Sequence, residues 1–279
     1  MVGKLDRMLP SPLLKASAAF HVAAAAALCI TPDAWPLWLA GFVADHMILS
    51  TVGLVPRGTL LGPNLSRLPP ASVARNEVAI TIDDGPDPEV TPELLSILAR
   101  QGASATFFCV GERVRAFPQL ARQISRSGHA VENHTRCHPY AFSLYGPGRL
   151  QREVAGCQAD IAAVVGTVPA FFRAPAGLRN PLLQPVLTGC DVRLVSWTRR
   201  GFDTVESNPS VVRRRLLRDL AAGDILLLHD GRAARSHDGR AVILNVLSEV
   251  LESIRGAGLK PVTLRQAFGL ESDGGRDRG

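Results

Sequence analysis

Several protein classes are excluded by what this sequence lacks. It has only five cysteines in 279 residues. No two of them have Cys-x-x-Cys spacing, so neither a disulfide framework nor a structural zinc knuckle is supported. No internal repeat and no signature of a DNA- or RNA-binding module is present. The net charge of +6 is moderate, and the one basic run, Arg213 to Arg215, lies in a pattern typical of a solvated helix face. We therefore expect no nucleic-acid partner.

The N-terminal part of the chain is much more apolar than the rest. The stretches 13–30 and 34–55 are separated by a tight turn, Thr31-Pro32-Asp33. As helices rising about 1.5 Å per residue, they would be roughly 27 and 33 Å long, which is close to the thickness of a bilayer core. We expect residues 1–60 to form a helical hairpin that contacts a membrane through residues 13–55.

Asp45 and His46 keep a second interpretation of this hairpin open. Ionisable side chains are costly at the centre of a bilayer, so the two segments also fit a buried helical pair in a soluble protein. Trp35 and Trp38 suit a membrane interface, and no small-x-small site follows Ile30 to indicate a cleaved signal peptide. The predicted location is a bacterial-type inner (cytoplasmic) membrane, with these helices as the anchor.

Basic residues bear on the orientation of the hairpin. Lysines and arginines flank its two outer ends, and the turn between the helices has none. The positive-inside rule then places both ends in the cytoplasm. Large domains can translocate against this rule, so the side of the membrane that holds the rest of the chain stays open.

The remainder of the chain has the pattern of an α/β protein. Proline, glycine and asparagine punctuate residues 61–75, which we expect to be a linker. Within residues 76–270, apolar strand-like runs alternate with helical patterns, which predicts a parallel sheet. About seven such units, with polar groups following three of the strands, favour a barrel over an open sheet. The tail, residues 271–279, is predicted to be disordered.

Turn and capping residues set the expected element boundaries in this region. Thr91 followed by Pro92 is typical of a helix start, because threonine caps and proline is tolerated at the first helical position. The other expected helices cover residues 117–127, 149–165, 210–222 and 241–255. The expected strands cover residues 78–82, 105–110, 128–131, 171–172, 193–197, 225–228 and 260–263.

Two short polar segments, about 50 residues apart, carry most of the chemistry. Thr81-Ile82-Asp83-Asp84-Gly85-Pro86 offers two adjacent carboxylates, and His134-Thr135-Arg136-Cys137-His138 offers two imidazoles spaced i, i+4. One aspartate and two histidines form a three-ligand set that leaves a divalent metal open to water and substrate. The second aspartate can take a proton from that water. The pattern indicates metal-assisted hydrolysis.

These segments resemble the signatures of one family. The aspartate segment resembles the first signature of the polysaccharide deacetylase (NodB homology) family, and residues 133–139 resemble the second. Arg173-Ala174-Pro175-Ala176-Gly177 is similar to the third signature, and residues 225–230 are similar to the fifth. All four occur in order within residues 77–232. The resemblance implies a distorted (β/α) barrel and removal of an N-acetyl group, sometimes an O-acetyl or formyl group, from a sugar.

The resemblance also implies roles for individual residues. Asp83 would be the general base, and Asp84, His134 and His138 would hold one divalent metal ion: zinc, with cobalt and nickel as alternatives. His229 would be the general acid that protonates the leaving amine. Amide hydrolysis needs each of these roles, because the carbonyl is a poor electrophile and the amine a poor leaving group.

Further residues are assigned by the same resemblance. Arg173 would hold the ionised base in place. The backbone N–H of Ala176, in the substrate-binding turn that includes Pro175, would bind the developing oxyanion. Leu226 and Leu228 would wall a pocket for the acyl methyl group.

The sequence departs from the family pattern at two places. Ala176 stands where the third signature usually has a bulky aromatic residue, which alters the substrate wall. In the fourth signature, the spacing from Trp197 makes Asp203 the candidate partner of His229, but Thr204 replaces the usual tryptophan. Trp197 itself is expected in the barrel core.

Three functions are compatible with these observations. The first is a metal-dependent deacetylase of an acetylated amino-sugar glycan. The second is a deacetylase or deformylase of a lipid-linked sugar precursor, which the predicted membrane hairpin favours. The third is a catalytically silent carbohydrate-binding or membrane scaffold protein, and the retention of both aspartates and all three site histidines argues against it.

Overall fold

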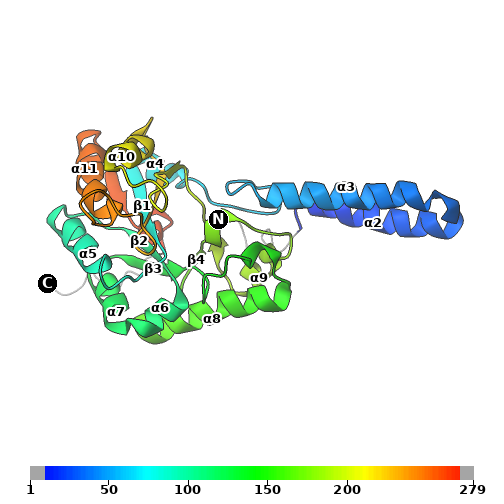
Figure 1. Ribbon diagram of the computed structural model, residues 1–279, viewed down its shortest axis with the longest axis horizontal. Coiled ribbons are helices and arrows are strands. Elements are labelled where there is room, and N and C mark those ends of the chain that lie inside the picture. Colours follow the sequence, from blue (N-terminus) through cyan, green and yellow to red (C-terminus); the bar gives the residue numbers. More distant parts are fainter. Residues whose placement is uncertain (1–9, 271–279) are drawn as a thin grey trace.

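The protein consists of a helical hairpin that projects from an α/β domain (Figure 1). The structure is a computed structural model that describes residues 10–270, so the predicted disordered tail lies outside the described residues. The hairpin comprises α2 (Pro12–Ile30) and α3 (Trp35–Gly53), joined by the short helix η1 (Pro32–Ala34). The two helices that the sequence predicts are therefore present.

Aromatic and polar contacts hold the two helices of the hairpin together. Phe20 packs against Phe42, with ring centroids 5.5 Å apart. Asp45 accepts a hydrogen bond of 2.8 Å from the Ser17 hydroxyl, so this carboxylate has a partner inside the hairpin. Among the described residues, α2 is the one helix long and apolar enough to cross a membrane.

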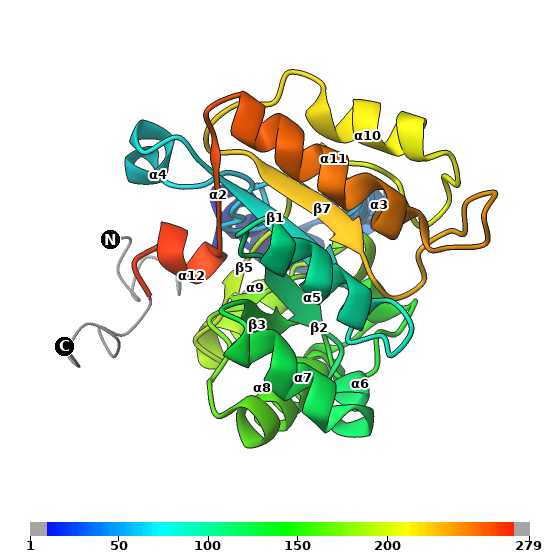
Figure 2. The ribbon, with the colours of Figure 1, turned by 90° about the vertical axis from the view of Figure 1, so that its left-hand side faces the viewer.

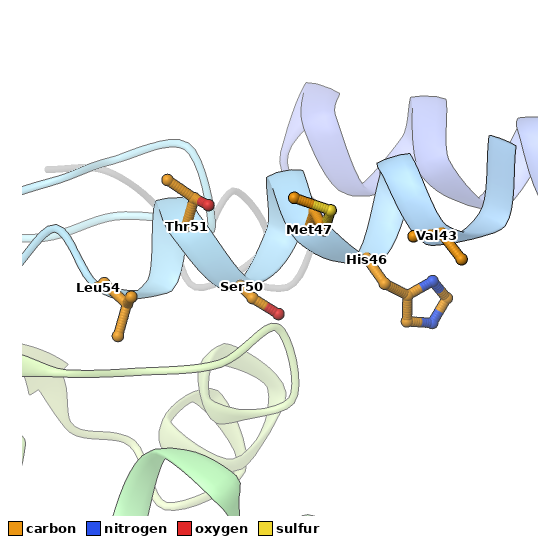
Figure 3. A pocket seen from close by; sticks show the side chains of 6 residues that line it. All are labelled: Val43, His46, Met47, Ser50, Thr51 and Leu54. Atoms are coloured by element: carbon orange, nitrogen blue, oxygen red, sulfur yellow. The ribbon is translucent and has the colours of Figure 1, made fainter. Parts of the chain in front are cut away.

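The outer surface of α3 is largely apolar. Met47 and Leu54 are 64% and 61% exposed. They belong to an open hollow of about 400 Å³ on α3 (Figure 3), which is lined by Val43, His46, Met47, Ser50, Thr51 and Leu54.

The α/β domain is built on one parallel sheet, as the alternating pattern predicts. The strand order is β5-β4-β3-β2-β1-β7-β6, and β8 also pairs with β1. The strands are β1 (Glu77–Asp83), β2 (Thr106–Cys109), β3 (Ala130–Asn133), β4 (Phe171–Phe172), β5 (Arg193–Leu194), β6 (Arg199–Arg200), β7 (Ile225–His229) and β8 (Lys260–Val262). The sheet is curled into a distorted (β/α) barrel. Its two end strands, β5 and β6, are not paired with each other.

Helices cover the outer face of this sheet (Figure 2). The larger ones are α5 (Thr91–Arg100), α7 (Pro118–Arg126), α8 (Pro147–Val165), α10 (Pro209–Leu217) and α11 (Val242–Gly256). The domain also has shorter helices, of which α12 packs in the core inside the barrel: α4 (Pro70–Ala74), α6 (Gly111–Ala116), η2 (Phe142–Leu144), η3 (Pro175–Gly177), α9 (Leu183–Gly189) and α12 (Leu264–Ala267).

Strand alternation separates two faces of the sheet. Ile80 and Ile82 of β1 lie in the large apolar core between sheet and helices. Ala79 of the same strand points the other way, into the core inside the barrel. Asp83 lies on that inner side too, at the end of the strand, where its carboxylate lines the cavity. Because successive side chains of a strand point to opposite faces, β1 delivers its catalytic candidate to the barrel interior.

Several element boundaries differ from the prediction. The strand expected over residues 193–197 stops at Leu194, and Val195 instead forms an isolated bridge with Leu65. The helix expected over residues 210–222 ends at Leu217, because the chain turns there and Asp219 has a left-handed φ of 51°. The short helices α4, α6, α9 and α12 were not predicted.

The segment expected to be a linker is packed against the domain. Leu61 and Leu68 are buried, and Leu65 hydrogen-bonds through its backbone to Leu194 and Ser196. Helix α4 occupies residues 70–74 within it. Proline and glycine in residues 61–75 therefore shape turns of a packed segment, and do not indicate a free linker.

Candidate active site

A cavity of about 350 Å³ lies at the carboxyl ends of the central strands. Asp83, Asp84 and His229 enter it from the ends of β1 and β7, and His134 and His138 enter from the loop after β3. The structure thus brings together the five residues for which the sequence predicts acid, base and ligand roles. Catalytic groups at carboxyl ends of parallel strands are the usual arrangement in α/β barrels.

Asp84, His134 and His138 form a cluster that could hold one metal ion. Their candidate ligand atoms all lie within 4.8 Å of one another. Asp84 Oδ1 lies 3.3 Å from His134 Nε2 and 3.1 Å from His138 Nε2. This oxygen is buried and has no well-formed hydrogen bond. A buried carboxylate oxygen without a partner is costly, and a cation at this point would satisfy it.

The tautomer of His134 supports the same conclusion. Its Nδ1 donates a hydrogen bond of 2.8 Å to the main-chain carbonyl of Arg173, so the lone pair of Nε2 faces the Asp84 oxygen. Two acceptors that face each other repel unless a cation or proton lies between them. A histidine that donates its second N–H to a carbonyl is the usual arrangement for a metal ligand. The residues present fit a divalent metal.

The charges of the cluster also suit a metal. Burial opposes ionisation of Asp84. The hydrogen bond and charge of His134, with the other nearby imidazoles, outweigh burial and hold the pKa of this carboxyl well below its usual range. Burial, reinforced by His134, lowers the pKa of His138 to about 4. At neutral pH the cluster therefore offers a carboxylate and a neutral imidazole, the forms that bind metal. Oxygen and nitrogen ligands suit zinc, cobalt and nickel.

Asp83 is held by a buried arginine. Arg173, which has no exposed surface, donates from Nη1 to Asp83 Oδ1 over 2.7 Å and to Thr81 Oγ1 over 2.7 Å. Its Nη2 donates to the carbonyl of Ser196 over 2.9 Å. The second carboxylate oxygen, Oδ2, lies 3.8 Å from His134 Nε2 and so faces the ligand cluster. Arg173 fixes one oxygen of Asp83 and leaves the other free for proton transfer.

His229 is paired with Asp203, the predicted partner. Its Nδ1 donates to Asp203 Oδ1 over 2.9 Å, and its backbone N–H donates to Asp203 Oδ2 over 2.7 Å. Burial alone would lower the pKa of His229, but Asp203, followed by Asp83 and Asp84, outweighs burial and raises the pKa to about 9. The imidazole is therefore charged at neutral pH and can donate a proton from Nε2.

The turn after β4 supplies a candidate for the oxyanion site. The backbone N–H groups of Gly177 and Leu178 donate to the carbonyls of Ala174 and Pro175 inside the turn. The N–H of Ala176 is thus the candidate donor for the substrate. Ala176 lines the cavity and has a left-handed φ of 54°. Pro175 is buried.

The expected acyl pocket is corrected by the structure. Leu226 and Leu228 lie in the core between the sheet and the helices and do not line the cavity. Leu227 lies inside the barrel and lines it. The reason is the alternation of side chains along β7. Leu227 and His229 share the inner face of the strand, so Leu226 and Leu228 point to the opposite face.

Trp197 lies both in the inner core and on the cavity wall. It is 7% exposed and packs in the core cluster inside the barrel, as the sequence predicts, and it also lines the cavity. Sequence reasoning missed four further lining residues, Tyr140, Arg200, Val205 and Arg232. None of them belongs to a signature segment, although Tyr140 directly follows residues 133–139 and Arg232 lies two residues after Asp230.

Strained backbone is concentrated around the cavity. Asp84, His138, Ala176 and Arg232 all have positive φ without being glycine. Such conformations cost free energy and persist only where the surroundings impose them. Gly231 shows how close the loops are, because a Cβ at this position would lie 2.6 Å from the main-chain oxygen of Asp84.

Comparison with known proteins places this site in a family. The family model described as polysaccharide deacetylase matches residues 71–195. A peptidoglycan-N-acetylglucosamine deacetylase of Bacillus cereus is 33% identical over 198 residues, which are 70% of this chain and 90% of that protein. A chitooligosaccharide deacetylase of Azorhizobium caulinodans is 32% identical, over 69% of this chain and 96% of that protein. The chain belongs to the polysaccharide deacetylase family.

Solved structures share the fold. The family 4 carbohydrate esterase from Streptomyces lividans, solved in complex with acetate, has a TM-score of 0.61 and 28% identity, over 67% of this chain and 91% of that chain. A family 4 pseudoenzyme from Bacillus anthracis has a TM-score of 0.66 and 20% identity, over 75% of this chain and 69% of that chain. A carbohydrate esterase and a pseudoenzyme both share this fold, so the fold alone does not separate an active site from a silent one.

Proposed function

We propose that the protein is a metal-dependent hydrolase that removes an N-acetyl group from an amino-sugar glycan. The observation that carries the proposal is the convergence of the Asp84–His134–His138 cluster, the arginine-bound carboxylate of Asp83 and the imidazolium of His229 on one cavity. The relatives whose names state an acetylated amino-sugar substrate support this substrate class.

Asp84, His134 and His138 would hold the metal. A divalent ion bound there polarises the amide carbonyl and lowers the pKa of water at the site. Zinc is the proposed metal, with cobalt and nickel as alternatives, because a carboxylate with two imidazoles suits all three. Arg173 supports the cluster from behind, since its carbonyl fixes the ring of His134.

Asp83 and His229 would move the two protons of the reaction. Asp83 Oδ2, which faces the cluster, accepts the proton of the attacking water, while Arg173 keeps the carboxylate oriented through its hydrogen bond to Oδ1. His229 donates its Nε2 proton to the leaving nitrogen, and Asp203 stabilises the imidazolium before the transfer. The Ala176 N–H donates to the developing oxyanion, and Leu227 lies on the cavity wall where an acyl methyl group would pack.

We further propose that residues 13–55 attach the protein to a bacterial-type inner membrane. Helix α2 is apolar and long enough to span a bilayer, and exposed apolar side chains such as Met47 and Leu54 continue along α3. Full-length protein should therefore sediment with membranes and need detergent for extraction. Recovery of the full chain in the soluble fraction without detergent would refute the anchor.

A lipid-linked sugar is the second candidate substrate. The base of the hairpin contacts the active-site turn: a Cβ added at Gly177 would lie 2.6 Å from Pro56 Cβ, and the Arg179 N–H donates to Gly53 O over 3.1 Å. A membrane around the hairpin would then lie next to the cavity, where a sugar on a lipid carrier could reach it. Such a substrate could lose either an acetyl or a formyl group.

The native substrate can be identified in cells. Mass spectrometry of envelope glycans and lipid-linked sugars, with and without the gene, should show an increase of 42 Da for each retained acetyl group, or about 28 Da for each retained formyl group, when the gene is deleted. An increase in polymeric glycan supports the first candidate, and an increase in a lipid-linked sugar supports the second. Unchanged spectra in both fractions, in cells shown to express the protein, would support the catalytically silent alternative.

A further inference from the structure

The cavity carries two arginines that the deacetylation chemistry does not use. Arg200 and Arg232 both line it. Among the described residues, neither has a carboxylate partner, whereas two neighbouring arginines do: Arg173 pairs with Asp83, and Arg199 pairs with Asp224. Two guanidinium groups without counter-charge on a cavity wall need a reason.

Arg200 is held in place but not neutralised. It lies on β6 opposite Leu227, and its guanidinium stacks over Trp197 and Phe202, with Cζ 5.3 and 4.8 Å from the ring centroids. Its Nε is buried and has no hydrogen-bond partner. The neighbouring Arg199 points to the other face of the strand and is paired there. Stacking orders the guanidinium of Arg200 and leaves its N–H groups for a ligand.

Arg232 lies on the loop after β7 and also lines the cavity. Its Nη1 donates to His138 Nδ1 over 3.1 Å, because arginine can only donate. Its guanidinium also lies over the ring of Tyr140, with Cζ 5.1 Å from the ring centroid. These contacts hold Arg232 at the cavity wall and leave its charge without a carboxylate partner.

The cavity lining therefore contains two carboxylates, Asp83 and Asp84, and two arginines without a carboxylate partner, Arg200 and Arg232. We propose that these two arginines form an anion subsite that binds a phosphate carried by the amino-sugar substrate. A planar carboxylate is matched by one guanidinium fork, whereas the oxygens of a tetrahedral phosphate can accept from two forks that approach from different elements. This inference rests on the proposed function, because the phosphate is placed on the sugar whose amide is hydrolysed.

The phosphate could belong to a soluble sugar phosphate or to a sugar on a lipid phosphate. The hairpin base lies beside the subsite, since Arg57 Nη1 reaches the carbonyl of Thr198 over 3.4 Å and Thr198 lies two residues before Arg200. The recognition chemistry is the same for both sources: a phosphate oxygen and two guanidinium groups. The two sources differ in charge and in the lipid, and binding measurements can separate them.

Binding to the metal-free full-length protein in detergent tests the subsite apart from catalysis. Isothermal titration calorimetry with glucose 1-phosphate, which has no amide to hydrolyse, should show salt-sensitive binding that glucose lacks. Arg200→Gln and Arg232→Gln should each weaken it roughly 10- to 100-fold, the range for a hydrogen bond to a charged group. Arg218→Gln, on an exposed arginine outside the cavity, should leave it unchanged. Equal affinity for glucose and glucose 1-phosphate, or no effect of either cavity variant, would overturn the subsite even if deacetylation is confirmed.

Further variants and ligands complete this test. Arg200→Lys, which retains a charge but not the planar fork, should bind more tightly than Arg200→Gln, and thermal unfolding checks that each variant is folded. A polyprenyl-phosphate glucose in the same detergent distinguishes the sources: tighter binding than glucose 1-phosphate assigns a lipid-linked substrate, and weaker binding assigns a soluble one.

Turnover provides an independent test. The ratio of kcat/KM for N-acetylglucosamine 1-phosphate to that for the methyl glycoside of N-acetylglucosamine should fall at least tenfold in both glutamine variants. An unchanged ratio in an active enzyme would contradict the subsite and leave the deacetylase assignment standing.

Discussion

Arg173 donates to Asp83 Oδ1 over 2.7 Å, and its main-chain carbonyl accepts from His134 Nδ1 over 2.8 Å. One residue at the end of β4 therefore orients both the proposed general base and a proposed metal ligand. The side chain acts on the carboxylate, and the backbone acts on the imidazole. The metal cluster and the proton acceptor are in this way held in one fixed relation, which the reaction requires.

Replacement of the base should separate turnover from metal binding. In Asp83→Asn, the amide can still accept from Arg173 but cannot take the proton of water. We expect a fall in kcat of about 10²- to 10⁴-fold, the usual contribution of general base catalysis, with metal content unchanged by plasma mass spectrometry. A loss smaller than tenfold would assign the proton acceptor elsewhere.

Replacement of a ligand should remove metal and activity together. His134→Ala deletes one of the three proposed ligands, whose Nε2 lies 3.3 Å from Asp84 Oδ1. We expect the purified variant to retain little metal after dialysis and to lose activity in proportion. His237→Ala, at an exposed histidine, is the matched control and should behave like the wild type. Retention of stoichiometric metal by His134→Ala would exclude this residue as a ligand.

The His229–Asp203 pair should set the alkaline limit of the enzyme. The pKa of His229 is raised to about 9, so the acid form is present below pH 9, and kcat/KM should fall tenfold per pH unit above it. Asp203→Asn removes the charge that stabilises the imidazolium, so the pH at which kcat/KM begins to fall should decrease by at least about one unit. If that pH does not change, another group controls the alkaline fall in kcat/KM.

The same pair makes a prediction for stability. The folded pKa of His229 lies above the unfolded value of about 6.5. Its contribution to the free energy of unfolding is therefore fully present below pH 6.5 and is lost as the pH rises through 9. The melting temperature of the wild type should exceed that of Asp203→Asn by more at pH 6 than at pH 10. An equal difference at both pH values would contradict the assignment.

The packed segment after α3 should determine which truncations remain folded. A chain that begins at Leu54 keeps Leu61, Leu65 and Leu68, whereas a chain that begins at Ser72 loses two buried leucines and the bridge from Leu65 to Val195. Each buried leucine contributes about 1.5–3 kcal/mol. Thermal unfolding should show a stable 54–279 protein and a markedly less stable 72–279 protein. Equal melting temperatures would restore the interpretation of a free linker.

The central site could be predicted because its signals are local in the sequence. Asp83 and Asp84 follow an apolar strand directly, and His134 and His138 share one short loop, so their chemistry shows in a few neighbouring residues. The structure places these groups and His229 around one cavity. Parallel strands bring their carboxyl ends to one edge, which is why residues far apart in the sequence meet there.

Other features depend on geometry that the sequence does not display. Leu227 rather than Leu228 reaches the cavity, because moving one residue along a strand moves the side chain to the other face of the sheet. The residues around them in β7 are apolar on both faces, so the sequence does not show which leucine faces the cavity. Arg200 and Arg232 reach the cavity only through the curvature of the sheet and the loop after β7. Residues 61–75 looked like a linker because proline and glycine mark turns equally well in packed and free segments.

Acetate release by the purified full-length protein tests the central claim most directly. Zinc-loaded protein incubated with an N-acetylated chitooligosaccharide should produce acetate and free amine in equal amounts. Release should stop after chelation, return when zinc, cobalt or nickel is restored, and be nearly absent in Asp83→Asn. Undiminished acetate release by the fully chelated protein, or by Asp83→Asn, would contradict the account of a metal-dependent deacetylase built on this cluster.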